Sequence, residues 1–190
     1  AHFFLLKKLL AGVEKTRFYL DQDIGMKTWY LAAFKEEIAN GKSDGFLVTM
    51  EKDLTVDMKR QVMREAKAEI SQLAEMPYEQ INPEALKLIF HEIIKDNMEN
   101  PFVTQKTGEQ WIKIPRPSMN EPSKMIHAFT SIHRYKPDHQ AELYLRGSLH
   151  AIDRFFMQIR RKLSTFERPS QSGTSQQRIW NGYSPYNPGM

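Results

Sequence analysis

The alternation of helical and strand patterns in the first fifty residues is the feature that most restricts the fold. Residues 2–12 have a helical apolar spacing that ends at Gly12, and residues 26–38 form a second helical pattern. A short β-favouring run follows each of them, at residues 16–20 and at residues 45–50. Two strands that are joined by a helix with tight connections pair in parallel. The sequence therefore predicts a parallel pair with a right-handed helical crossover, which is typical of an α/β layer.

The middle of the chain loses the strand pattern. Residues 53–74 carry a helical apolar stripe within a heavily charged sequence. A second helix has a strong start signal, with Asn82 as its cap and Pro83 in its first turn, and it ends at Asn100 before another proline. We interpret these two helices as a structural insertion whose alternating Glu and Lys residues form a solvated face.

Core-like sequence returns after these helices. Residues 111–114 predict a short strand, and residues 123–129 predict a helix after a proline-rich stretch. Residues 137–166 predict one long helix with a bend at Gly147.

These patterns divide the chain into four parts. Residues 1–50 form the α/β part of a core, and residues 51–110 form a mostly helical insertion. Residues 111–168 return to the core with a long basic helix, and residues 169–190 form a carboxyl-terminal tail. The expected fold class is α/β, with parallel strands, crossover helices and a long helix near the carboxyl terminus.

The composition excludes several classes of protein. The chain has 190 residues, of which 41% are hydrophobic, and this is enough to fold without cross-links. It has no cysteine, which excludes disulfides and thiolate sites. No apolar run approaches the roughly 18 residues of a membrane span, so we expect a cytoplasmic protein. The apolar stretch that begins at Ala1 is interpreted as a truncated start and not as a signal peptide.

Positive charge is concentrated toward the carboxyl terminus. The formal net charge is +4, and residues 153–178 contain six basic and two acidic residues, so the rest of the chain is neutral in sum. A basic segment on a neutral body indicates a localised contact with a polyanion.

An acidic pair ends the first predicted strand. Asp21 and Asp23 follow residues 16–20 and precede Gly25. Open α/β sheets place their ligand sites at the carboxyl ends of strands, so Asp21 is well placed to bind a metal ion. The alternative is a turn or a helix cap, since Asp and Gly are common in both.

A second acidic residue opens a basic helix. Asp153 and Arg154 stand ahead of Arg160, Arg161 and Lys162. If this segment is a helix, its carboxylate would bind a metal ion and its cations would bind phosphate groups of the same substrate. This chemistry suits a polynucleotide. The alternative is an ordinary amphipathic helix with solvated charges and these core residues: Ile152, Phe155, Phe156 and Ile159.

Three segments together resemble the ribonuclease-H-like catalytic core of DDE-type insertion-sequence transposases. They are residues 18–23 with the following Gly25, residues 144–156, and residues 180–188, which contain Trp, Tyr, Asn and Pro. The resemblance spans nearly the whole chain and identifies it as an amino-terminally truncated member of a bacterial family. It places the protein in the cytoplasm, associated with the nucleoid.

The resemblance implies DNA cleavage and strand transfer assisted by two divalent metals, Mg²⁺ or Mn²⁺. Asp21 matches the second acid of the catalytic triad and Asp153 the third, with Asp23 as a neighbouring candidate. Glu142 is the substitute if Asp153 is structural. Arg160 matches a contact for the DNA end, and these residues are expected to bind DNA with it: Arg154, Arg161 and Lys162.

Further implications concern partners and activity. The partners are transposon ends, target DNA and further copies of the chain. The first acid of the triad is absent, so this chain is expected not to cleave DNA by itself.

Two other classes of protein remain open. A non-catalytic DNA-binding or structural remnant of a mobile-element protein would keep the basic helix without a metal site. A zinc protein would use His127, His133 and His139, although their six-residue spacing suits no single helix face. His150 is a weaker candidate for a supporting role beside Asp153.

Overall fold

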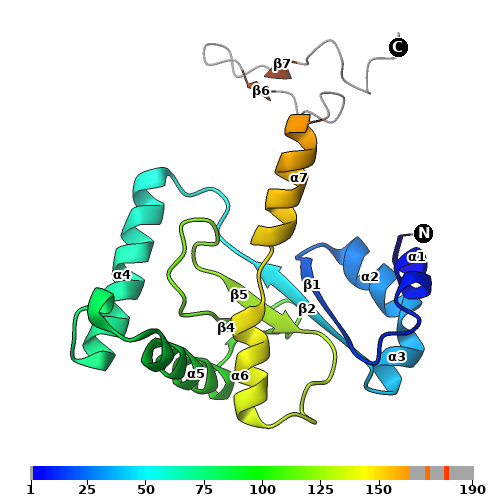
Figure 1. The fold of residues 1–190 in the computed structure, drawn as a ribbon, viewed down its shortest axis with the longest axis horizontal. Helices are drawn as coiled ribbons and strands as arrows, with labels where there is room; N and C mark the ends of the chain where they lie inside the picture. The colour runs from blue at the N-terminus through cyan, green and yellow to red at the C-terminus, as the bar shows by residue number, and fades with distance from the viewer. Residues whose placement is uncertain (1, 163–169, 172–177, 180–190) are drawn as a thin grey trace. The chain divides into compact units, whose positions relative to one another are not determined.

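The computed structural model describes residues 2–162, 170–171 and 178–179. The chain divides into two compact units, residues 1–149 and residues 150–190. The first unit contains a five-stranded mixed sheet with helices on its faces (Figure 1). The α/β class expected from the sequence is confirmed in this form.

The amino-terminal part contains the parallel pair that the sequence predicts. Helix α1 (His2–Leu9) is followed by strand β1 (Thr16–Asp21), helices α2 (Ile24–Ala33) and α3 (Lys35–Ala39), and strand β2 (Ser43–Thr49). Strands β1 and β2 pair in parallel from Thr16 opposite Ser43 to Asp21 opposite Val48. The single helix predicted over residues 26–38 is divided at Phe34, whose buried ring anchors the junction of α2 and α3 in the core.

The helical middle segment is also confirmed. Helix α4 (Val56–Ala74) begins after Thr55, whose hydroxyl accepts a hydrogen bond from the Met58 N–H. A short 3₁₀ turn, η1 (Tyr78–Gln80), leads to helix α5 (Pro83–Glu99). Asn82 caps α5 by accepting from the Glu84 N–H, as its position before Pro83 predicts.

The rest of the sheet is antiparallel. Strands β3 (Phe102–Val103), β4 (Gln110–Lys113) and β5 (Met125–Ala128) complete the order β1-β2-β5-β4-β3. Parallel pairing is thus limited to β1 and β2, which differs from the expected sheet of parallel strands. The helix predicted over residues 123–129 is wrong: this segment is β5, because β2 and β4 supply backbone hydrogen-bond partners on both of its edges.

The predicted long helix over residues 137–166 is divided in two. Helix α6 (Pro137–Arg146) ends before Gly147, and helix α7 (His150–Lys162) begins the second unit. The Gly147 backbone is extended, and its carbonyl accepts a hydrogen bond from Lys124. A Cβ on Gly147 would overlap the end of the buried Ile126 side chain, so a larger residue fits here only if that side chain shifts. The break is therefore a product of packing.

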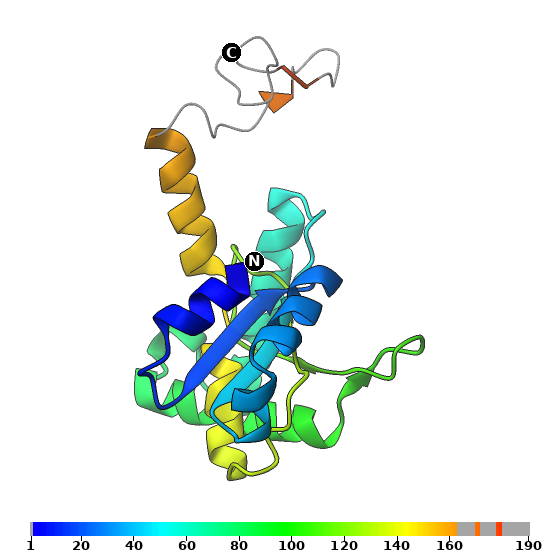
Figure 2. The same ribbon diagram turned by 90° about the vertical axis from the view of Figure 1, so that its right-hand side faces the viewer.

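Two cores lie on opposite faces of the sheet in the first unit. Phe46 and Val48 of β2 face helices α5 and α6, whereas Leu47 between them faces α2. Figure 2 shows the helices on both sides of the strands. The alternation follows from the two-residue period of a strand. Helices therefore cover both faces of β2.

Beyond α7, the structure describes one further pair of strands. In the second unit, β6 (Ser170–Gln171) pairs antiparallel with β7 (Arg178–Ile179). The motif at residues 180–188 lies outside the described residues. Among the helices that the structure describes, none is long and apolar enough to cross a membrane.

Candidate functional site

Asp21 lies at the carboxyl end of β1, where the parallel pair ends. Its side chain is 40% exposed, and Oδ1 accepts a hydrogen bond from the Gln22 N–H at 2.9 Å. Lys52, just beyond β2, places Nζ at 3.1 Å from Oδ2 and 3.3 Å from Oδ1. The carboxylate therefore faces solvent at a strand end, as the sequence predicts, with a lysine beside it.

Asp23 has a different role, because it caps α2. Its Oδ1 accepts a hydrogen bond from the Met26 N–H at 2.9 Å, and its backbone is extended, as a capping residue requires. A Cβ on Gly25 would lie 2.9 Å from this oxygen, so Gly25 makes room for the cap. The helix-cap interpretation left open by the sequence therefore applies to Asp23, and Asp21 is the better candidate metal ligand of the pair.

The metal site expected around Asp21 is incomplete. Glu51 follows β2, but its Oε2 accepts a hydrogen bond from the Ser123 hydroxyl at 2.9 Å. Within the described residues, no group of three or more His, Cys, Asp or Glu side chains gathers to hold a metal ion. Asp21 alone does not fit the needs of Mg²⁺, which takes several oxygen ligands, and no catalytic step through a metal follows from this geometry.

Asp153 lies in the first turn of α7, so it belongs to the second unit and Asp21 to the first. Within the second unit, these apolar side chains of α7 are exposed: Ile152, Phe155 and Phe156. The amphipathic-helix alternative put these side chains in a core, and the described residues of the second unit do not form one around them. Arg154 and Lys162 are exposed on α7, and the side chains of residues 160 and 161 lie outside the described set.

Glu142 is an ion-pair partner on α6, and it does not share a helix with Asp153. Its carboxylate contacts Arg146 at 2.7 Å, His91 at 2.9 Å and Lys87 at 3.0 Å. Burial by itself raises the pKa of Glu142, but the hydrogen bonds from these three side chains outweigh it and lower the pKa to about 2. Cations already occupy both oxygens, so Glu142 is poorly suited to replace Asp153 as a metal ligand.

The three histidines named for zinc have separate partners. His127 Nδ1 lies 2.9 Å from the Gln110 carbonyl oxygen, and His139 Nε2 lies 3.3 Å from Arg17 Nη2. His133 lines a cavity of about 260 Å³ beside β4, β5 and α6. In the described part of the chain these side chains do not form a metal site.

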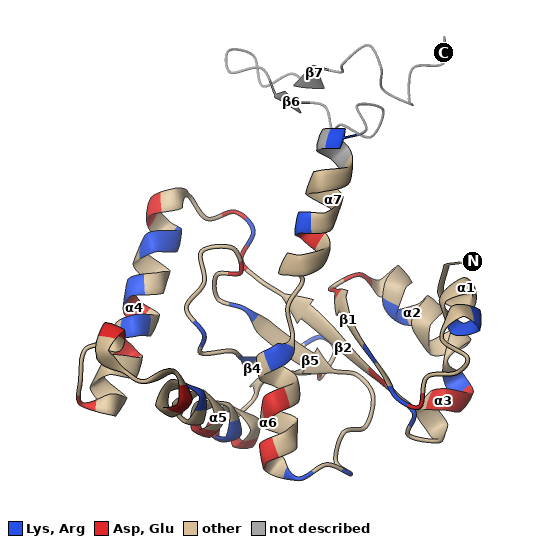
Figure 3. Cartoon of the chain, viewed as in Figure 1, with Lys and Arg blue, Asp and Glu red and all other residues tan. Residues whose placement is uncertain are grey.

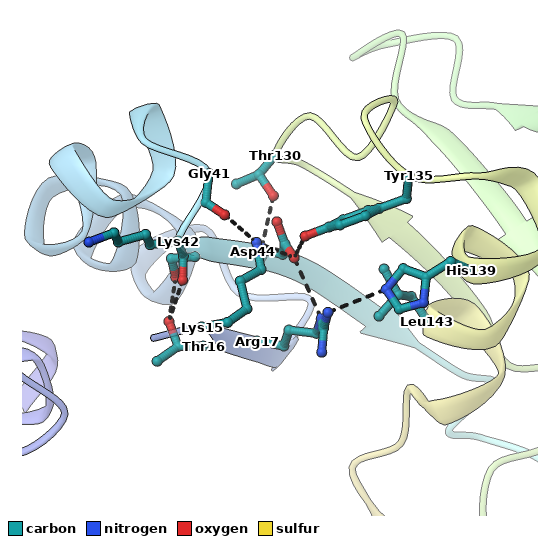
Figure 4. Close-up of polar contacts among 12 residues, drawn as sticks. Lys15, Thr16, Arg17, Gly41, Lys42, Asp44, Thr130, Tyr135, His139 and Leu143 are labelled. Carbon is teal, nitrogen blue, oxygen red and sulfur yellow. Dashed lines mark hydrogen bonds and ion pairs between the residues drawn. The ribbon is translucent and has the colours of Figure 1, made fainter. Parts of the chain in front are cut away.

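A basic cluster that sequence reasoning missed surrounds Asp44, a fully buried residue near the start of β2 (Figure 4). Lys15 Nζ lies 2.9 Å from Asp44 Oδ2, Arg17 Nε lies 3.6 Å from it, and Arg134 forms an ion pair with Oδ1. The Tyr135 hydroxyl donates to Oδ2 at 2.8 Å. We call Lys15, Arg17, Arg134 and Asp44 the Asp44 cluster.

The sequence indicates only part of this cluster. Lys15 and Arg17 share one side of the chain by two-residue spacing, and Arg17 pairs with Asp44 in the parallel register. Arg134 comes from the loop before α6, 90 residues along the chain from Asp44. Figure 3 shows basic residues in that loop and along α4.

Comparisons with known proteins identify no relative: no family model, curated protein or solved structure matches this chain.

Proposed function

We propose that this chain is part of a DDE-type DNA transposase and that Asp21 supplies one carboxylate to its metal site. The observation that carries the proposal is the position of Asp21, a solvent-facing carboxylate at the carboxyl end of a parallel strand pair. Ligand sites in open α/β sheets lie at this end of the strands. The three segments that resemble the transposase family add support from the sequence.

The proposal requires Mg²⁺ or Mn²⁺ and more ligands than Asp21 provides. Divalent metals in phosphoryl transfer are held by carboxylates and activate the attacking oxygen or stabilise the leaving one. Asp153 is the further acid that we propose on sequence grounds alone, and Arg154 with the basic residues 160–162 is proposed to bind the DNA backbone. DNA ends, target DNA and further copies of the chain are the proposed partners.

A non-catalytic DNA-binding role is the second candidate. The contact between Asp21 and Lys52 favours it, because an ammonium group stands where a metal ion would bind. In that case Asp21 and Lys52 form a surface ion pair, which contributes little to stability and leaves no metal site.

Manganese binding by the full chain separates these candidates. We expect Mn²⁺ titration, followed by electron paramagnetic resonance, to show a site that Asp21→Asn weakens. Asp23→Asn is the matched control, since it makes the same charge change two residues away and asparagine still caps a helix. Lys52→Met should tighten Mn²⁺ binding, because it removes the competing cation.

The link to DNA is tested in the same proteins. If Asp21 holds Mn²⁺ at the DNA-binding site, Mn²⁺ should raise the affinity for duplex DNA at constant ionic strength, and Asp21→Asn should remove that increase. If the parent chain, Asp21→Asn and Lys52→Met all bind Mn²⁺ with equal affinity, the metal site is excluded and the non-catalytic role is supported. Mn²⁺ binding at Asp21 without any effect on DNA affinity would contradict the transposase proposal.

A further inference from the structure

The Asp44 cluster holds more positive charge than its buried carboxylate needs. One cation neutralises one carboxylate, yet Lys15, Arg17 and Arg134 all contact Asp44, which leaves a net charge of about +2. Glu14 precedes the cluster, but among the described residues no ion pair joins it to these cations. The surplus charge is therefore available to a second anion.

The three cations also reach the solvent. Their side chains are 24%, 32% and 36% exposed, for Lys15, Arg17 and Arg134 respectively, although the carboxylate that they share is fully buried. Lys15 also donates to the Gly41 carbonyl, and Arg17 contacts His139. A lysine has three N–H donors and an arginine has five, so these contacts leave donors on each cation for an external ligand.

The cluster is held in place before any ligand arrives. Lys15 Nζ lies 5.3 Å and Arg134 Cζ lies 4.8 Å from the centre of the Tyr135 ring. Arg134 also packs beside Gly41, where a Cβ would lie 3.5 Å from its guanidinium and where φ is +69°. Cations that are already oriented lose less conformational entropy on binding a phosphate.

We infer that the Asp44 cluster is a phosphate-binding site that contacts the phosphodiester backbone of DNA. Two guanidinium groups and one ammonium group match phosphate oxygens in charge and in donor geometry. The inference rests on the proposed function only for the choice of DNA as the source of the phosphate. The site is separate from Asp21, because the cluster surrounds the amino ends of β1 and β2 and Asp21 is at the carboxyl end of β1.

Salt-dependent DNA binding tests the inference. Binding of a short DNA duplex to the full chain is measured by fluorescence anisotropy over a range of salt concentrations. Arg17→Gln should weaken binding and reduce the slope of log affinity against log salt by about 0.9, the value expected for one lost phosphate contact. Arg17 is chosen because it is the most distant of the three cations from Asp44. The matched control is Arg60→Gln on α4, which makes the same charge change in an exposed pair with Asp57.

Protection of Lys15 tests the site without any substitution. Duplex DNA should slow acetylation of Lys15 in the native chain, measured by mass spectrometry, and should affect Lys67 on α4 much less. Inorganic phosphate at the same ionic strength should protect Lys15 weakly.

Three results would overturn the inference. Equal effects of Arg17→Gln and Arg60→Gln would show that only overall charge matters. Acetylation of Lys15 that neither DNA nor inorganic phosphate slows would remove the site itself, and protection by inorganic phosphate without protection by DNA would remove DNA as its ligand. None of these results depends on Mn²⁺, so this inference and the proposed metal site fail separately.

Discussion

Lys124→Met should destabilise the protein strongly, because it removes an ammonium group from a buried ion pair. Lys124 Nζ lies 2.8 Å from Glu121 Oε2, and the two side chains are 5% and 7% exposed. Lys124 also donates to the Gly147 carbonyl at 2.7 Å. The Glu121 carboxylate in turn accepts from the Ser148 hydroxyl and the Leu149 N–H. One substitution therefore disturbs the whole junction after α6.

The expected loss of unfolding free energy is about 3 kcal/mol. Removing one partner of a buried ion pair costs about 3–5 kcal/mol, since the other charge stays buried. The low end applies here because the hydrogen bonds from Ser148 and Leu149 to Glu121 remain. Burial raises the pKa of Glu121, but the hydrogen bonds from Lys124 and Ser148 outweigh it and hold the pKa below its usual value of 4.5.

The lowered pKa determines how this loss depends on pH. A carboxyl group whose pKa is lower in the folded state stabilises the fold above its unfolded pKa, and this stabilisation is lost as the pH falls through the folded pKa. The cost of Lys124→Met should therefore be largest near neutral pH and shrink in acid. Adding Glu121→Gln to Lys124→Met should recover part of the loss at pH 7, because no buried charge then remains in the pair.

Urea unfolding of the full chain, followed by circular dichroism at neutral and acid pH, measures these differences. The control is Lys67→Met, which removes a lysine from an exposed pair with Glu79 and should change stability little. A Lys124→Met protein as stable as the parent, or a loss no greater than that of Lys67→Met, would refute the reasoning.

Three other predictions use the same chain. Gly147→Ala should cost about 1–3 kcal/mol and lower the thermal midpoint, because the added Cβ would overlap Ile126, and an unchanged midpoint would contradict this packing. Glu142→Gln should lower the unfolding free energy by roughly 2–3 kcal/mol at pH 7, as measured by urea unfolding. The loss should almost vanish near pH 2, because the native carboxylate takes up a proton there. A loss of unfolding free energy that is the same at both pH values would contradict the ion pairs of Glu142. Replacing residues 160–162 with alanine should reduce the salt slope of DNA binding by about 2–3, and an unchanged slope would exclude these residues as backbone contacts.

Local sequence signals predicted the structure correctly where the interacting groups lie close together in the chain. Asn82 and Pro83 predicted the start of α5, because a cap hydrogen bond joins neighbours in the chain. The apolar runs at residues 16–20 and 45–50 predicted β1, β2 and their parallel pairing, since a short helical connection allows little else. The sequence also favoured Asp21 over Asp23 at the strand end, but it did not assign the helix cap to Asp23.

Tertiary contacts decided the rest. By itself the sequence determined the α/β class, the first parallel pair and the two helices α4 and α5, because periodicity and caps are local properties. It did not determine that β5 is a strand, since the backbone partners of β5 come from β2 and β4. The break after α6 depends on Lys124 and on the close approach of Ile126 to Gly147. The Asp44 cluster depends on a loop 90 residues away, because a buried carboxylate takes its cations from whichever segments the fold brings to it.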